Sequence, residues 1–181
     1  MKLHWDNYFE LDATLVMGVL NVTPDSFSDG GLFRDPEDAV VQAHRMIREG
    51  ADILDIGGQS TRPGAAPITP REELDRVLPV VERLVCETTI PLSIDTFSPE
   101  VADACLSSGV TILNDVCGLR DPAMRRVAAQ HGKPVILMHM RGNPQTMQED
   151  VVYDDVVSEL KNFFEQRIRE AQESGVQEIM I

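Results

Sequence analysis

Residues 53–95 read ILDIGGQSTRPGAAPITPREELDRVLPVVERLVCETTIPLSID, and they contain one complete strand–helix–strand unit. Short apolar runs at 53–56 and 92–94 are typical of parallel strands that are covered on both faces. Between them, a Thr-Pro pair at 69–70 supplies a capping residue and a first-turn proline, which predicts a helix over 70–87. Two parallel strands joined by a helix are therefore expected here.

The same pattern repeats on both sides of this unit. Further apolar runs predict strands at 15–20, 111–113, 135–138 and 179–181. Further helices are predicted over 36–49, 99–108, 122 to the glycine at 132, and 153–174. A capping residue followed by proline opens four of the five helices. Strands that alternate with helices in this way predict an α/β protein with a parallel sheet.

Two closures of such a sheet compete, an open doubly wound sheet and a (β/α)8 TIM barrel. The glycine fingerprint of dinucleotide-binding folds is absent after the first strand. Instead, polar residues follow each of the first five strands, and barrel active sites draw on several strand ends in this way. These residues are Asn21, then Gln59 and Ser60, Asp95, Asn114, and His139 with Arg141. The pattern favours the barrel, of which this chain supplies six strands and five helices.

Length limits how much of a barrel can form. The chain has 181 residues, of which 43% are hydrophobic and 25% charged, and this suits one sizeable core. Residues 1–181 are therefore predicted to form a single domain. A complete barrel needs eight strands and about 250 residues. The barrel is thus expected to be truncated at the sixth strand, so that either the native sequence continues past Ile181 or something else covers the exposed strand edge.

Charge and cysteine content exclude several classes of protein. The formal net charge is −14, which argues against partners such as nucleic acid or an anionic membrane surface. No apolar run approaches the length of a spanning helix, and the N-terminus lacks the apolar core of a signal peptide. Cys86, Cys105 and Cys117 include no CxxC pair, and we expect them to be small buried hydrophobes in a reducing compartment. A cytoplasmic protein is therefore expected.

Three strand-end residues suggest binding chemistry on their own. The carboxylate of Asp95 can accept two N–H bonds, and the amide of Asn114 offers both a donor and an acceptor, so that together they fit a 2-amino-4-oxopyrimidine ring. The alternative is that both residues have a structural role and cap helices. Asn21 carries a hard amide oxygen suited to Mg²⁺ or to a pyrophosphate-bound Mg²⁺. Its alternative is a role in the turns of the long loop that follows.

The second and fifth strand ends are less specific. Ser60, Thr61 and Arg62 combine two hydroxyls with a cation and suit an anion such as phosphate. On these residues alone, an irregular turn with a surface arginine is the somewhat better explanation. Met138 suits the wall of a site for a flat ligand, or else fills the core. His139 is expected to be structural rather than an acid or base. Sequence motifs of zinc proteases and serine hydrolases are absent.

Taken together, four long segments resemble the dihydropteroate synthase family. They are MGVLNVTPDSFSDGG at 17–31, GADILDIGGQSTRPGA at 50–65, the stretch from LSIDTFSPEVADA to TILNDVCGLRDP at 92–122, and LMHMRGNPQTMQ at 137–148. The resemblance implies a (β/α)8 barrel. It also implies a transferase of folate biosynthesis, which condenses 6-hydroxymethyl-7,8-dihydropterin pyrophosphate with 4-aminobenzoate and releases pyrophosphate to give 7,8-dihydropteroate.

The resemblance also assigns roles to individual residues. By this resemblance, the pterin-binding residues are Asp95, Asn114 and Met138, and the Mg²⁺ ligand is Asn21. The residues that bind pyrophosphate and 4-aminobenzoate lie in the second loop and are Thr61, Arg62 and Pro63 together with Ser60. A mobile loop that folds over the substrates contains Asp25, Ser26 and Phe27. Sulfonamide sensitivity and a homodimer are further implied properties.

The chain departs from the family at two points. Gln59 stands where the family often has glutamate, which removes a charge near the anion site. The family's later aspartate, its lysine and its late arginine–histidine pair would follow Ile181. Two alternatives therefore stay open: a methyltetrahydrofolate-binding methyltransferase, which shares the pterin barrel, and a non-catalytic pterin-binding or partner-binding protein.

Overall fold

The computed structural model describes residues 14–23, 36–59, 67–143, 146–147 and 151–181. Six strands are present in this part of the chain: β1 Met17–Asn21, β2 Ile53–Gly57, β3 Leu92–Asp95, β4 Ile112–Asp115, β5 Val135–Leu137 and β6 Ile179–Met180. They alternate with the helices α2 Pro36–Arg48, α3 Pro70–Glu87, α4 Pro99–Ser107, α5 Pro122–His131 and α6 Val156–Glu173. The predicted alternation of strands and helices is confirmed.

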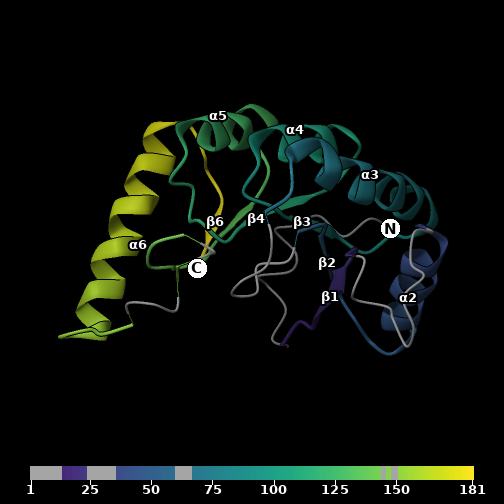
Figure 1. Cartoon of the computed structure of the whole chain (residues 1–181), viewed down its shortest axis with the longest axis horizontal. Coiled ribbons are helices and arrows are strands. Elements are labelled where there is room, and N and C mark those ends of the chain that lie inside the picture. Colours follow the sequence, from purple (N-terminus) through teal and green to yellow (C-terminus); the bar gives the residue numbers. More distant parts are fainter. Residues whose placement is uncertain (1–13, 24–35, 60–66, 144–145, 148–150) are drawn as a thin grey trace.

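All six strands lie in one parallel sheet in the order β1-β2-β3-β4-β5-β6. Right-handed crossovers between sequential parallel strands all place their helices on the same side of a sheet. The five helices accordingly form an arc over the outer side of the strands (Figure 1). A doubly wound sheet would reverse its strand order at a switch point. The unbroken order is that of a (β/α)8 barrel, of which six consecutive strands and the five helices between them are seen in the described residues.

Local signals explain where the helices begin. The Thr69 side chain accepts from the backbone N–H of Glu72, whose carboxylate accepts in return from the backbone N–H of Thr69, so that α3 opens with a capping box. Ser98 and Asp121 cap α4 and α5, each before a proline at the first helical position. The last helix begins at Val156, three residues later than expected, because Asp155 accepts from the N–H of Ser158 and sets the N-cap there.

Side chains on the strands alternate between the two faces of the sheet. One face packs against the helices and forms the apolar core, to which β2, β3, β4 and β5 contribute large side chains such as Leu54, Ile56, Ile94, Leu113 and Leu137. The residues between them in the sequence therefore point to the concave side. The core thus fixes which side chains face the interior of the barrel.

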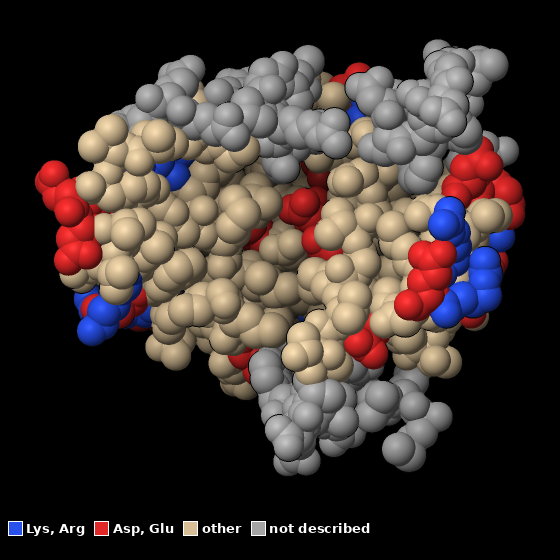
Figure 2. Space-filling model, turned by 90° about the horizontal axis from the view of Figure 1, so that it is seen from below, with Lys and Arg blue, Asp and Glu red and all other residues tan. Residues whose placement is uncertain are grey.

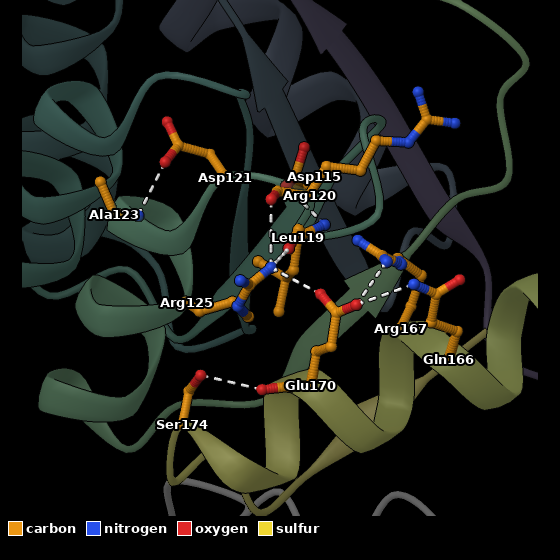
Figure 3. Close-up of polar contacts among 10 residues, drawn as sticks. All are labelled: Asp115, Leu119, Arg120, Asp121, Ala123, Arg125, Gln166, Arg167, Glu170 and Ser174. Atoms are coloured by element: carbon orange, nitrogen blue, oxygen red, sulfur yellow. Dashed lines mark hydrogen bonds and ion pairs between the residues drawn. The ribbon is translucent and has the colours of Figure 1, made fainter.

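A network of polar contacts attaches α6 to the body of the fold (Figure 3). Arg125 of α5 donates from Nη1 to the carbonyl oxygen of Leu119 at 2.6 Å, and the same atom lies 3.1 Å from Glu170 of α6. Arg167 contacts the other oxygen of that carboxylate at 2.7 Å. Both arginines are largely buried. Glu170 therefore joins two helices to the turn that follows β4.

Two further features bear on the expectations from sequence. All three cysteines are free; Cys105 is buried and Cys117 half-buried, but Cys86 is exposed, and the expectation of a buried residue is wrong there. Cys86 lies near the end of α3 on the side away from the core. Among the described helices, none is long and apolar enough to cross a membrane.

Gly58 provides a test of how closely α3 packs under the end of β2. A Cβ at Gly58 would lie 2.6 Å from Cγ1 of Val77 and 3.2 Å from the backbone oxygen of Glu73. We expect Gly58→Ala to lower the free energy of unfolding by about 1–3 kcal/mol, because the buried Val77 side chain and its neighbours on α3 must shift to admit the methyl group. Urea denaturation measures this value. An unchanged unfolding midpoint would contradict the close packing.

Candidate functional site

Three residues predicted for the site lie in one row across neighbouring strands. Asn21 of β1 is paired with Gly57 of β2, Gly57 with Asp95 of β3, and Asp95 with Asn114 of β4. All four residues stand at the carboxyl ends of their strands, where the active sites of barrels are found. Backbone pairing therefore brings together residues that are far apart in the sequence.

Gly57 places no side chain between two of these residues, Asn21 and Asp95. A Cβ built on Gly57 would lie 3.5 Å from Oδ2 of Asp95 and 3.7 Å from Oδ1 of Asn21. Both oxygens therefore stand on the concave side of the sheet, above the position where a side chain is missing. The glycine therefore leaves a gap about the size of a methyl group beside the carboxylate and the amide oxygen.

The concave side is acidic at its centre. Asp and Glu side chains are visible in the central hollow when the molecule is seen from this side (Figure 2). Burial, together with the nearby charges of Asp55, Glu73 and Asp115, raises the pKa of Asp95 to about 7. A carboxylate in this position is costly to ionise alone. It is suited to a ligand that offers N–H donors or a positive edge.

Asp55 of β2 is a part of the site that the sequence analysis did not single out. It is buried, and its Oδ2 accepts a hydrogen bond of 2.9 Å from Nδ2 of Asn114. Burial raises the pKa of Asp55, while Ser93 and Asn114 oppose this shift. The signal was present in the sequence, because Asp55 is the charged residue within the apolar run of its strand and lies two positions before Gly57.

The strand-end residues Asp95 and Asn114 do not cap helices. Ser98 caps α4 and Asp121 caps α5, so neither Asp95 nor Asn114 has that role. Asp115 points away from the site, and its carboxylate accepts the backbone N–H groups of Cys117 and Leu119. These bonds hold the turn after β4, where Leu119 has a φ of 53°. Asp115 is therefore a structural residue.

The structure also places Met138 and His139, two residues that follow β5. Met138 follows β5 with an exposed side chain, and by alternation it faces the concave side with Ile136. His139 packs edge-on against Phe163 of α6, with the ring centroids 4.7 Å apart, and burial together with Arg120 and Arg141 lowers its pKa. His139 thus belongs to the packing of α6, as expected.

The other predicted residues lie outside the described part of the chain. These are Asp25, Ser26 and Phe27 of the first loop and Ser60, Thr61, Arg62 and Pro63 of the second. The start of the second loop is nevertheless defined, since Nη1 of Arg76 donates to the carbonyl oxygen of Gly58 at 3.0 Å. Helix α3 therefore anchors the backbone from which that loop departs.

The side chain of Asn21 is chemically suited to a magnesium ion. Its Oδ1 is a hard oxygen donor on the concave side, beside the gap at Gly57. Magnesium ions are commonly held by one or two protein oxygens, with water and substrate phosphates supplying the rest. In the described residues, no group of three or more His, Cys, Asp or Glu side chains is arranged to hold a metal.

Comparison with known proteins connects this geometry to a family. Residues 17–181 match the model of the family described as pterin binding enzyme. The chain is 50% identical over 164 residues to the dihydropteroate synthase of Synechocystis, covering 90% of this chain and 57% of that protein. A structure of Xanthomonas albilineans dihydropteroate synthase with 4-aminobenzoic acid has a TM-score of 0.84 at 49% identity, covering 92% of this chain and 59% of that one.

A structure of Yersinia pestis dihydropteroate synthase in complex with a sulfonamide drug is similarly close. Its TM-score is 0.84 at 45% identity, and the match covers 90% of this chain and 59% of that one. The chain belongs to the pterin-binding enzyme family. It spans somewhat under three fifths of the length of the dihydropteroate synthases that it matches.

Gly57→Ala tests whether the gap between Asn21 and Asp95 is used by a ligand. The added methyl group would make ordinary van der Waals contacts, so stability should stay within about 1 kcal/mol of the wild type. Affinity for a pterin should fall about tenfold in the full-length protein, because the methyl group occupies the approach to both oxygens. Titration calorimetry measures the affinity. Equal affinities would mean that no ligand enters this gap.

Asp95→Asn tests the cost of the buried charge. The folded state holds the Asp95 proton up to a pH of about 7, whereas an unperturbed carboxyl titrates near 3.8. Stability contributed by this raised pKa is therefore present at low pH and is lost as the pH rises through 7. The loss is about 1.4 kcal/mol per pH unit up to pH 7, or roughly 2–3 kcal/mol from pH 5 to pH 8. Relative to the wild type, the melting temperature of Asp95→Asn should therefore rise by about 5–10 °C over this range.

The matched control is Asp38→Asn on the surface of α2, which removes the same formal charge from an exposed position. Its melting temperature relative to the wild type should not change in this way over the same pH range. Identical pH profiles for the two variants would show that Asp95 bears no special electrostatic cost.

Proposed function

We propose that this chain forms the pterin-binding part of a dihydropteroate synthase. The reaction joins 4-aminobenzoate to 6-hydroxymethyl-7,8-dihydropterin pyrophosphate and releases pyrophosphate and 7,8-dihydropteroate. Membership of the pterin-binding enzyme family supports this proposal, as do relatives of that name at about half identity over most of the chain.

The observation that carries the proposal is the pair Asp95 and Asn114 at adjacent positions of neighbouring strands. A pterin presents an amino group and ring nitrogens along one edge of a flat bicycle. A carboxylate beside an amide offers complementary acceptors and donors at the spacing of two paired strands. Ionised Asp95 then gains N–H donors from the ligand, which offsets the cost of its burial.

Met138 contributes an apolar surface to the proposed pocket. Its side chain is exposed at the end of β5, next in order after the strand that bears Asn114. A thioether packs well against the face of a flat aromatic ring. Polar groups would therefore form hydrogen bonds with the edge of the pterin, and Met138 would pack against its face.

Asn21 is proposed to hold Mg²⁺ with the pyrophosphate group of the substrate. The bound ion would neutralise negative charge on the leaving group. Thr61, Arg62 and Pro63, with Ser60, are proposed to bind pyrophosphate and 4-aminobenzoate, and the loop with Asp25, Ser26 and Phe27 to cover both substrates. In the proposed protein, the residues contributed by this chain bind and orient the reactants.

The chemistry needs no covalent intermediate on the protein. The amine nitrogen of 4-aminobenzoate forms a bond to the exocyclic methylene of the pterin, the bond from that carbon to the pyrophosphate oxygen breaks, and the nitrogen loses a proton. The amine is already a competent nucleophile, so orientation accounts for much of the acceleration. Asp95 and Asn114 would fix the position of the methylene group relative to the amine.

The setting of the protein is part of the same proposal. A cytoplasmic enzyme agrees with three free cysteines. Sulfonamides, which resemble 4-aminobenzoate, should inhibit it, and a structure of a relative holds such a drug. A homodimer is the proposed assembly. The direct test is release of pyrophosphate by the full-length protein with both substrates and Mg²⁺; failure to release it with the purified, folded protein would reject the synthase assignment.

Asp95→Ala tests the pterin-binding role of this carboxyl group. Loss of the acceptor leaves N–H groups of the pterin without partners, which should weaken pterin binding by about 1–3 kcal/mol. Titration calorimetry of the full-length protein with 6-hydroxymethyl-7,8-dihydropterin pyrophosphate measures this change. Asp75→Ala on the exposed surface of α3 serves as the control and should bind as the wild type does. If Asp95→Ala bound equally well, Asp95 would not belong to the pocket.

A further inference from the structure

Asp55 and Asn114 are hydrogen bonded although their strands, β2 and β4, are not neighbours. Nδ2 of Asn114 donates to Oδ2 of Asp55 at 2.9 Å. Strand β3 lies between them, and the residue paired with Asp55 on that strand is Ser93. The short side chain of Ser93, which is fully buried, leaves room for the two longer side chains to meet over it.

The direction of this hydrogen bond follows from the chemistry of its two partners. A carboxylate can only accept, so the amide of Asn114 must turn its nitrogen toward Asp55. Its carbonyl oxygen, Oδ1, is the other end of the planar amide group and is therefore directed away from Asp55. The same hydrogen bond favours the ionised form of Asp55 against the effect of burial. Asp55 itself is almost fully enclosed by protein.

We propose that Asp55 is a positioning residue that turns the Asn114 amide so that its carbonyl oxygen is offered to a bound pterin. The inference rests on the proposed function and adds to it the direction of one hydrogen bond between the protein and the pterin. Asn114 acts toward the ligand as an acceptor, and its partner on the ligand is an N–H group. Selectivity then favours rings with a donor at this point, because a ring with an acceptor there would face another oxygen.

Exchange of the two side-chain types tests this proposal. Asp55→Asn keeps the size of the side chain but can donate as well as accept, so the orientation of Asn114 is no longer imposed. We expect its affinity for 6-hydroxymethyl-7,8-dihydropterin pyrophosphate to be about tenfold lower, as for one lost hydrogen bond. In the double variant Asp55→Asn with Asn114→Asp, the amide at 55 donates to the carboxylate at 114, which still presents an oxygen to the ligand. Its affinity should recover to within about threefold of the wild type.

Titration calorimetry on the full-length protein measures the affinities, and a thermal melt of each variant shows that it is folded. Asp38→Asn on the surface of α2 is the matched control for the first exchange and should bind as the wild type does. Wild-type affinity in Asp55→Asn would overturn the inference. So would a folded double variant that binds no better than Asp55→Asn, because Asn114 would then act as a donor.

These outcomes are distinct from failure of the proposed function. If the wild-type protein does not bind the pterin probe, both the proposed function and the inference are rejected. If the wild type binds the probe and the exchange has no effect, only the role of Asp55 is rejected. A melting temperature reduced in Asp55→Asn but restored with affinity in the double variant would support the pairing of the two residues.

Discussion

Parallel backbone pairing holds Asn21, Gly57, Asp95 and Asn114 in one row across four strands, and the site depends on this register. A shift of one residue in any strand would turn its side chains to the opposite face. Asp95 would then enter the apolar layer against the helices, and Ile94 would face the hollow. The apolar residues of the strands thus secure the polar site, because burial of Leu54, Ile94 and Leu113 against the helices permits only one register.

The site is lined by small residues at two positions, and ionisation of its buried carboxyl groups is costly. Gly57 removes a side chain from the centre of the row, and Ser93 is the short residue one layer below it. The space gained is bordered by carboxylates whose pKa values are raised by burial, among them Asp55 and Asp95. A pocket of this kind is unfavourable when it is empty of N–H donors, and a ligand rich in such donors relieves that cost.

The layer of helices and turns on the opposite face stabilises the strand ends. Asp115 holds the turn after β4 through two backbone N–H groups, and Arg125 binds the same turn from α5. Glu170 extends the connection to α6, the last helix of the arc (Figure 3). A polar side chain of the candidate site and a structural carboxylate therefore stand next to each other on β4, since Asn114 faces the hollow and Asp115 faces the helices.

Much of the fold could be predicted from the sequence because its signals are local. Apolar runs mark each strand, and capping residues followed by proline mark the starts of α3, α4 and α5. Polar residues at strand ends identified Asp95 and Asn114, since the carboxyl ends of parallel strands meet at one edge. Cys86 was misjudged, because residue type alone does not tell which side of a helix faces the core.

What the sequence determined by itself was the order of the elements and the residue types at the strand ends, since both follow from patterns within a few residues. The contact of Asp55 with Asn114 was decided only by the tertiary structure. These residues are 59 positions apart, and their hydrogen bond requires two strands, the register between them and a small residue on the strand in the middle. No local pattern specifies such a contact, because it exists only when the sheet has formed.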